Sequence, residues 1–206
     1  MDVKDAIEQI RLYPGALVDC SFGQGRDVFL EQLEERTGRN EAYSVDNYIE
    51  DCRDTIAGLI QRVAPYEVPK DYIFFLEYYG GIFIEGDNHT LSILGTGPNV
   101  EEWYSSVESD DALLEVGRQG FLKLGSLNFA RNEENNSQRI AYFLDLAGNV
   151  QKHCVIGVGP WGKETLTPID ILKNIHAYHE MWKKVANSFT AWLEQAAITK
   201  GGFGYT

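Results

Sequence analysis

The amino-acid sequence predicts an α+β fold in which a mixed or antiparallel sheet packs against helices. Two amphipathic helical patterns follow one another over residues 46–63 and 69–79, and several short apolar runs typical of strands come after them. Helices grouped ahead of a run of strands are typical of this class. The 206 residues, of which 44% are hydrophobic, suffice for one ordinary globular core with an added N-terminal segment.

We interpret residues 1–44 as an N-terminal helical extension that packs on this core. Asp2 precedes a short helical pattern that ends at Tyr13–Gly15, and residues 16–20 are expected to form a brief buried strand. A second helical pattern follows the glycine-rich segment 23–26. Such a segment can offer backbone N–H groups to an anion, but it lacks the remaining residues of a dinucleotide or phosphate loop, so we favour a simple tight turn.

Residues 46–63 form the clearest helix, which Asp46 is able to cap. Its apolar face is formed by Ile49, Cys52, Ile56, Leu59, Ile60 and Val63. The next helix is expected to begin at Pro69, where the missing N–H is not needed, and to end at Gly80-Gly81, which allows positive φ. The two helices should pack side by side. One core is expected to contain Ile56, Leu59, Phe75, Leu76, Phe143 and Phe189.

The rest of the chain alternates between strand and helix signals. Strands are predicted at residues 82–84, 90–94, 120–127, 140–146 and 149–158, the last two as a hairpin. Thr167, Pro168 and Asp170 mark a helix start, and an apolar pattern of helical spacing continues from there to Val185. A final helix should begin near Ser188, followed by a C-terminal tail over residues 198–206.

Two parts of this pattern resemble the signature of the SUKH superfamily. The first comprises Pro69, the pair Asp71-Tyr72, the pair Phe75-Leu76 and the doublet Gly80-Gly81. The second comprises Ser188-Phe189 and Trp192-Leu193, in which Trp stands where the family has Phe. The resemblance implies a SUKH-like domain over residues 45–197. The family includes bacterial immunity proteins that neutralise a cognate toxin domain and fungal regulators of cell-wall synthesis, so it implies a binding module.

Charge is distributed unevenly along the chain. Residues 1–110 contain 8 Lys and Arg against 22 Asp and Glu, whereas residues 111–206 contain 10 against 9. Within the first part, residues 71–117 hold ten acids and no Lys or Arg. Such a segment repels phosphate backbones, which disfavours direct nucleic-acid binding, and attracts basic proteins. It is either a steering surface for a basic partner or a solvated face that maintains solubility.

The sequence also predicts a cytoplasmic protein with reduced thiols. Cys20, Cys52 and Cys154 are odd in number, far apart and outside any C-x-x-C spacing, so buried reduced thiols are expected. No apolar run approaches the roughly 20 residues that cross a bilayer. The first residues lack the basic and apolar regions of a signal peptide. We therefore expect no membrane partner.

Two kinds of residue are candidates for catalysis or metal binding. His176 and His179 lie at i,i+3 of a predicted helix, a spacing that can supply two metal ligands, but no further ligand completes a site and we favour partly buried histidines. Two pairs of carboxylates could act in acid–base catalysis: Glu85 with Asp87, and the pair at 133–134. Loop carboxylates are, however, more often solvated or partner-facing. The sequence therefore predicts no catalytic residues, no metal site and no cofactor.

Aromatic residues on loops are the remaining candidates. Trp161 on the Gly159–Gly162 turn, and Trp103-Tyr104 in the acidic segment, are each suited to anchor a partner or to cover the edge of their own core.

Our preferred hypothesis is a non-catalytic protein-binding module. The resemblance implies an immunity protein whose partner is a toxin domain, such as a basic nuclease. The alternatives are a regulatory scaffold in cell-wall or signalling pathways and an acid–base hydrolase that uses Glu85 or Glu133. The candidate partner-binding residues are Glu85, Asp87, Glu101, Glu102, Trp103, Tyr104, Glu108, Asp110, Asp111 and Trp161.

Overall fold

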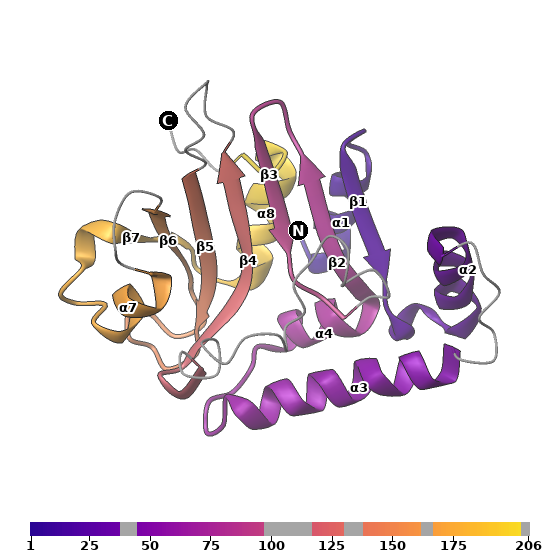
Figure 1. Cartoon of the computed structure of the whole chain (residues 1–206), viewed down its shortest axis with the longest axis horizontal. Coiled ribbons are helices and arrows are strands. Elements are labelled where there is room, and N and C mark those ends of the chain that lie inside the picture. Colours follow the sequence, from indigo (N-terminus) through magenta and orange to yellow (C-terminus); the bar gives the residue numbers. More distant parts are fainter. Residues whose placement is uncertain (38–44, 97–116, 130–137, 162–166, 203–206) are drawn as a thin grey trace.

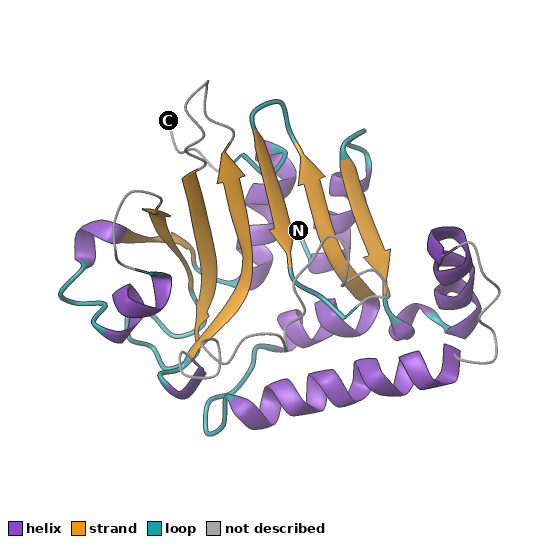
Figure 2. Ribbon diagram, viewed as in Figure 1, coloured by secondary structure: helices purple, strands orange, loops and turns teal. Residues whose placement is uncertain are grey.

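One antiparallel sheet with helices packed against it forms the body of the protein (Figures 1 and 2). The computed structural model describes residues 1–37, 45–96, 117–129, 138–161 and 167–202. In these residues seven strands form one sheet in the order β1-β2-β3-β4-β5-β6-β7, and each pairs antiparallel with its neighbour in the sequence. The predicted α+β class is confirmed, with a described sheet that is antiparallel throughout.

The elements carry the labels of Figure 1 and follow the chain from α1 to α8. Two short 3₁₀ helices, η1 and η2, lie among them. The bounds are α1 Val3–Arg11, β1 Ala16–Cys20, η1 Phe22–Gln24, α2 Arg26–Thr37, α3 Val45–Arg62, α4 Lys70–Tyr78, β2 Tyr79–Glu85, β3 His89–Ile93, β4 Phe121–Phe129, β5 Gln138–Asp145, β6 Val155–Trp161, α7 Pro168–Lys173, η2 His179–Met181, β7 Trp182–Ala186 and α8 Phe189–Thr199.

The sheet separates two layers of buried apolar side chains. Successive side chains of a strand point to opposite faces. Thus Tyr142 and Leu144 of β5 lie in a principal core, whereas Ala141 and Phe143 lie in a second cluster, here called the α7 cluster. Helices α1, α4 and α8 contribute to the principal core, and α7 packs on the opposite face near β5 and β6 (Figure 1). A third group, the β1 cluster, joins β1 to α2 and α3.

Local capping signals explain where several helices begin. Asp2 and Thr167 each form a capping box, with Asp5 and Asp170 respectively. Ser188 accepts a hydrogen bond from the backbone N–H of Ala191 at the start of α8. Each cap satisfies N–H groups that have no partner inside the helix. The predicted starts at Thr167 and Ser188 are therefore confirmed.

The N-terminal segment contributes directly to both the sheet and the core. Strand β1 forms one edge of the sheet and pairs with β2. In α1, Ile7 and Ile10 are fully buried in the principal core. The segment expected as an extension thus supplies a structural strand and a covering helix.

Phe143 and Ile60 differ from the prediction. The other five residues expected to share a core do share the principal core, but Phe143 lies in the α7 cluster because its position in β5 faces the other side of the sheet. Ile60, expected on the apolar face of α3, is 43% exposed.

The predicted helical continuation from residue 168 to 185 is wrong. Helix α7 ends at Lys173, and Asn174 leaves the helical region with φ −133° and ψ 45°. Residues 182–186 then pair with β6 as strand β7. The spacing of their apolar side chains fits a helix, but pairing with the sheet overrides that local preference.

The glycine doublet and the second strand of the hairpin also differ from expectation. Helix α4 begins at Lys70, one residue after Pro69, and ends at Tyr78 before the doublet. Gly80 and Gly81 lie inside β2, where Gly81 has φ 140° and allows a bulge opposite β1. Strand β6 starts at Val155, because residues 149–154 belong to the preceding turn.

Candidate functional site

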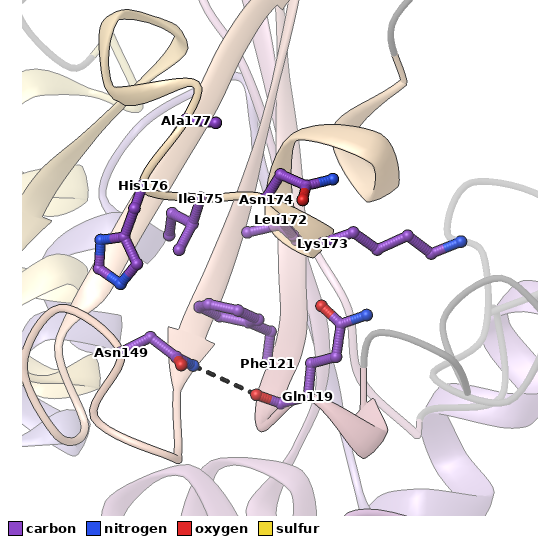
Figure 3. Close-up of a pocket in the computed structure, with 9 residues that line it drawn as sticks. All are labelled: Gln119, Phe121, Asn149, Leu172, Lys173, Asn174, Ile175, His176 and Ala177. Atoms are coloured by element: carbon purple, nitrogen blue, oxygen red, sulfur yellow. Dashed lines mark hydrogen bonds between the residues drawn. The ribbon is translucent and has the colours of Figure 1, made fainter.

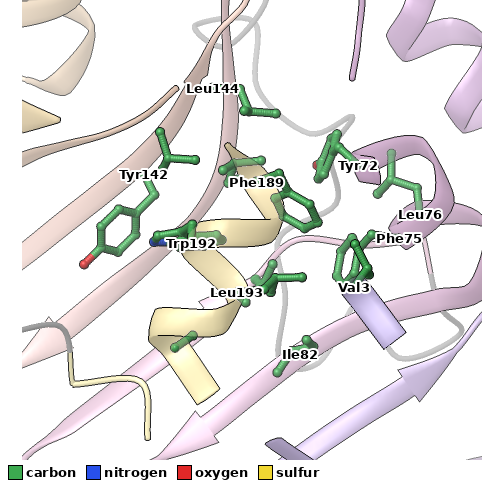
Figure 4. Packing of buried hydrophobic residues seen from close by; sticks show 14 of the residues in the cluster. Val3, Tyr72, Phe75, Leu76, Ile82, Tyr142, Leu144, Phe189, Trp192 and Leu193 are labelled. Carbon is green, nitrogen blue, oxygen red and sulfur yellow. The ribbon is translucent and has the colours of Figure 1, made fainter. Parts of the chain in front are cut away.

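The residues that resemble the SUKH signature are mostly buried in the principal core. Tyr72, Phe75 and Leu76 of α4 meet Phe189 of α8, with the ring centroids of Tyr72 and Phe189 4.9 Å apart (Figure 4). On the same helix α8, Trp192 packs against Tyr142 of β5, with ring centroids 5.0 Å apart. Leu193 is also fully buried. These residues stabilise the fold, and they do not form a surface that a ligand could reach.

Asp71 has a specific structural role between two helices. One oxygen of its carboxylate accepts from the backbone N–H of Tyr72, and the other accepts from the backbone N–H and hydroxyl of Thr190, at 3.1 and 2.7 Å. Thr190 lies in the first turn of α8. Asp71 therefore joins the first turns of α4 and α8, where a negative charge is favourable.

An acidic surface lies on helices α2 and α3 beside strand β1. Asp27, Glu31 and Glu35 recur every four residues on α2, and all three are exposed. On α3 a second stripe with the same spacing is formed by Asp46, Glu50 and Asp54, which are also exposed. Residues four apart lie on one side of a helix. We call these six residues the acidic face.

The starts of the two helices are linked at this face. Arg26 Nε donates to Asp46 Oδ1 at 2.9 Å, and both side chains remain well exposed. The neighbouring carboxylates on each helix repel one another at i,i+4, which destabilises a helix slightly. Asp27 and Asp46 lie in the first turns of their helices, where a negative charge is favourable, so the repulsion falls mainly on the later carboxylates of each stripe.

Beneath the acidic face, buried polar contacts fix α3 to the sheet. The thiol of Cys52 donates to the carbonyl oxygen of Thr96, with Sγ and O 2.7 Å apart. The hydroxyl of Thr96 donates to the carbonyl oxygen of Leu76 at 2.8 Å and lies 3.2 Å from the hydroxyl of Ser21. Thr96 is therefore held between α3, α4 and the end of β1.

Burial changes the acid–base behaviour of the thiols. It raises the pKa of Cys20 to about 12, with a further contribution from the charge of Asp19. It raises the pKa of Cys52 to about 11. Cys154, fully buried near Asp145, has its pKa raised to about 11 for the same reasons. All three cysteines are free, as the sequence predicted, and their neutral thiols make them poor nucleophiles.

Only some of the predicted partner-binding residues can be placed. Glu85 and Asp87 are exposed at the turn between β2 and β3, whereas Thr96 lies near Leu76, beyond the opposite end of these strands. The fold therefore does not bring Glu85 and Asp87 to the acidic face. The candidates at 101, 102, 103, 104, 108, 110 and 111 lie outside the described residues, as does the pair at 133–134.

Trp161 lies within strand β6, opposite Arg139 of β5, although the sequence suggested a turn. Its side chain is outside the described part of the chain. Gly159, with φ 128°, is also inside the strand.

The predicted helical histidine pair is not formed. His176 lies in the turn after α7 and His179 begins η2, so the two do not share one face of a helix. Among the residues that the structure describes, no group of three or more His, Cys, Asp or Glu is arranged to hold a metal ion. His89, on β3, contacts the end of α8 through Nε2 and the carbonyl oxygen of Lys200 at 3.0 Å.

A hollow of about 550 Å³ lies between α7, the turn that follows it and the start of β4. Figure 3 shows Phe121 between Gln119 and Asn149, with Leu172, Ile175 and His176 opposite. The buried side chains of Phe121, Leu172 and Ile175 provide its apolar part. We call it the α7 hollow. No local sequence pattern indicates this hollow, because its lining comes from three separate segments.

A buried carboxylate holds one wall of the α7 hollow. Asp145 is fully buried, and its two oxygens accept from the backbone N–H groups of residues 148, 149, 150 and 151 at 2.7–3.1 Å. This fixes Asn149, whose Nδ2 donates to the carbonyl oxygen of Gln119 at 3.2 Å. On the other wall, Trp182 Nε1 donates to the carbonyl oxygen of Ile175 at 2.8 Å. The described walls of the hollow are therefore preformed.

Comparisons with family models, curated proteins and solved structures found no match to this chain. In the described residues no helix is both long and apolar enough to cross a membrane.

Proposed function

We propose that this chain is a non-catalytic protein-binding module whose acidic face meets a basic protein. The observation that carries the proposal is the pair of acidic stripes on α2 and α3, each with three exposed carboxylates at a spacing of four residues. Like charges at this spacing do not help a helix form, but they present a concentrated negative surface to an approaching partner.

The two described residues that flank positions 97–116 lie near α3 or the residue that follows it. The described chain leaves at Thr96, which is bonded to Cys52 of α3, and re-enters at Gly117. An added Cβ on Gly117 would lie 3.6 Å from Val63, the residue that follows α3. Thr96 thus lies beside the half of α3 that carries the acidic stripe, whereas Gly117 lies beyond the other end of this helix.

The partner we propose is a toxin domain, which the SUKH resemblance implies, and a basic nuclease is the kind that suits this charge. Complementary charge would increase the association rate, and aromatic anchors such as Trp103 and Trp161 would slow dissociation. Binding would neutralise the toxin by covering its basic substrate channel. This mechanism needs neither a cofactor nor a covalent step.

The first prediction tests the acidic face by charge reversal. The test begins with a search of the genes next to that of this chain for a toxin domain, and association with such a domain is followed by stopped-flow fluorescence at several salt concentrations. Replacing Asp46, Glu50 and Asp54 with Lys should slow association by about tenfold or more at low salt and flatten its salt dependence. The far-UV circular dichroism spectrum should remain that of the parent.

Matched variants locate the binding surface. Glu85→Lys with Asp87→Lys changes an acidic turn outside the acidic face, and a five-residue reversal at 101, 102, 108, 110 and 111 changes the predicted segment. We expect the α3 and five-residue variants to slow association and the turn variant to change it little. An association rate that does not change in any of the three variants or with added salt would contradict the proposal.

A further inference from the structure

We draw no further inference here: the strongest candidate, the groove of about 510 Å³ at the starts of α1, α4 and α8, exposes the side chain of Met1 and part of Phe74, but nothing in the described residues shows what covers them.

Discussion

At the β1 end of the sheet the exposed carboxylates form two outward stripes, whereas near β5 and β6 one carboxylate is turned inward to hold a loop. Asp46, Glu50 and Asp54 belong to the first arrangement, and Asp145 belongs to the second. The outward carboxylates of Glu50 and Asp54 are exposed to solvent, and that of Asp46 is exposed but also accepts from Arg26. The inward carboxylate is occupied by four backbone N–H groups and serves the structure of its own chain.

The two edge strands are also protected differently. On β1 the backbone N–H of Ala16 is bonded to the carbonyl of Tyr13, and that of Cys20 is bonded to the side chain of Gln32. On β7 two exposed lysines, Lys183 and Lys184, stand at the edge. Both devices discourage pairing with another strand. Neither end of the described sheet therefore offers an open edge for strand pairing.

The largest effect on stability is expected at Leu76, in the principal core that lies between the two ends of the sheet. Leu76 is fully buried in the principal core, and its carbonyl also holds Thr96. Leu76→Ala should lower the free energy of unfolding by roughly 2–5 kcal/mol, because it leaves a cavity in close-packed surroundings. Leu76→Met, which keeps most of the volume, should cost less than about 1.5 kcal/mol. Urea unfolding measures both, and equal values for the two variants would contradict the assignment of this core.

A smaller and more local effect is expected at the other end. Asp145→Ala removes the acceptor of four backbone N–H groups in the turn 148–151 and should cost about 1–3 kcal/mol. Asp145→Asn keeps one carbonyl acceptor and should be intermediate. Hydrogen exchange should increase first at residues 148–151, while α2 and α3 keep their protection. A uniform increase in exchange over the whole chain would show that the loss of Asp145 destabilises the entire fold and not the turn 148–151 alone.

The smallest effect concerns the thiols beneath the acidic face. Because the folded pKa of Cys52 is raised to about 11 from its ordinary value of 9.0, the folded state retains more protons than the unfolded state between these values. The stability that this thiol contributes is present below about pH 9 and is lost as the pH rises toward 11. Unfolding measured at pH 8 and pH 10.5 should show this loss, and Cys52→Ala should reduce it. An identical pH dependence in the variant would exclude the thiol as its source.

Local signals made much of the fold predictable. The starts at Thr167 and Ser188 were found because a cap and its helix are neighbours in the sequence. The conformation of the stretch from Ile175 to Val185 was predicted wrongly, because Trp182–Ala186 takes its conformation from pairing with β6. Phe143 was assigned to the wrong side of the sheet, since the sequence shows alternation but not which face each helix covers.

The candidate sites were less accessible to sequence reasoning. The stripes on α2 and α3 have a spacing that is visible in the sequence. The segment 71–117, with ten acids and no Lys or Arg, is nevertheless the more obvious acidic feature, and the stripes were not predicted. The α7 hollow brings together Gln119, Asn149 and His176, which are about thirty residues apart in the sequence, so only the folded chain reveals it. The role of Asp145 depends on its complete burial, which no local pattern indicates.

The packing of the first helix against the last determines when the chain can complete its fold during synthesis. Each strand of the described sheet pairs with the next strand in the sequence, so the sheet can grow strand by strand as the chain emerges from the ribosome. Helix α1 also contacts β1, but it packs mainly against α8, where Tyr13 donates to the carbonyl oxygen of Ala197 and the Met1 amine pairs with Glu194. The cover that α8 gives to α1 is therefore complete only after α8 has been translated.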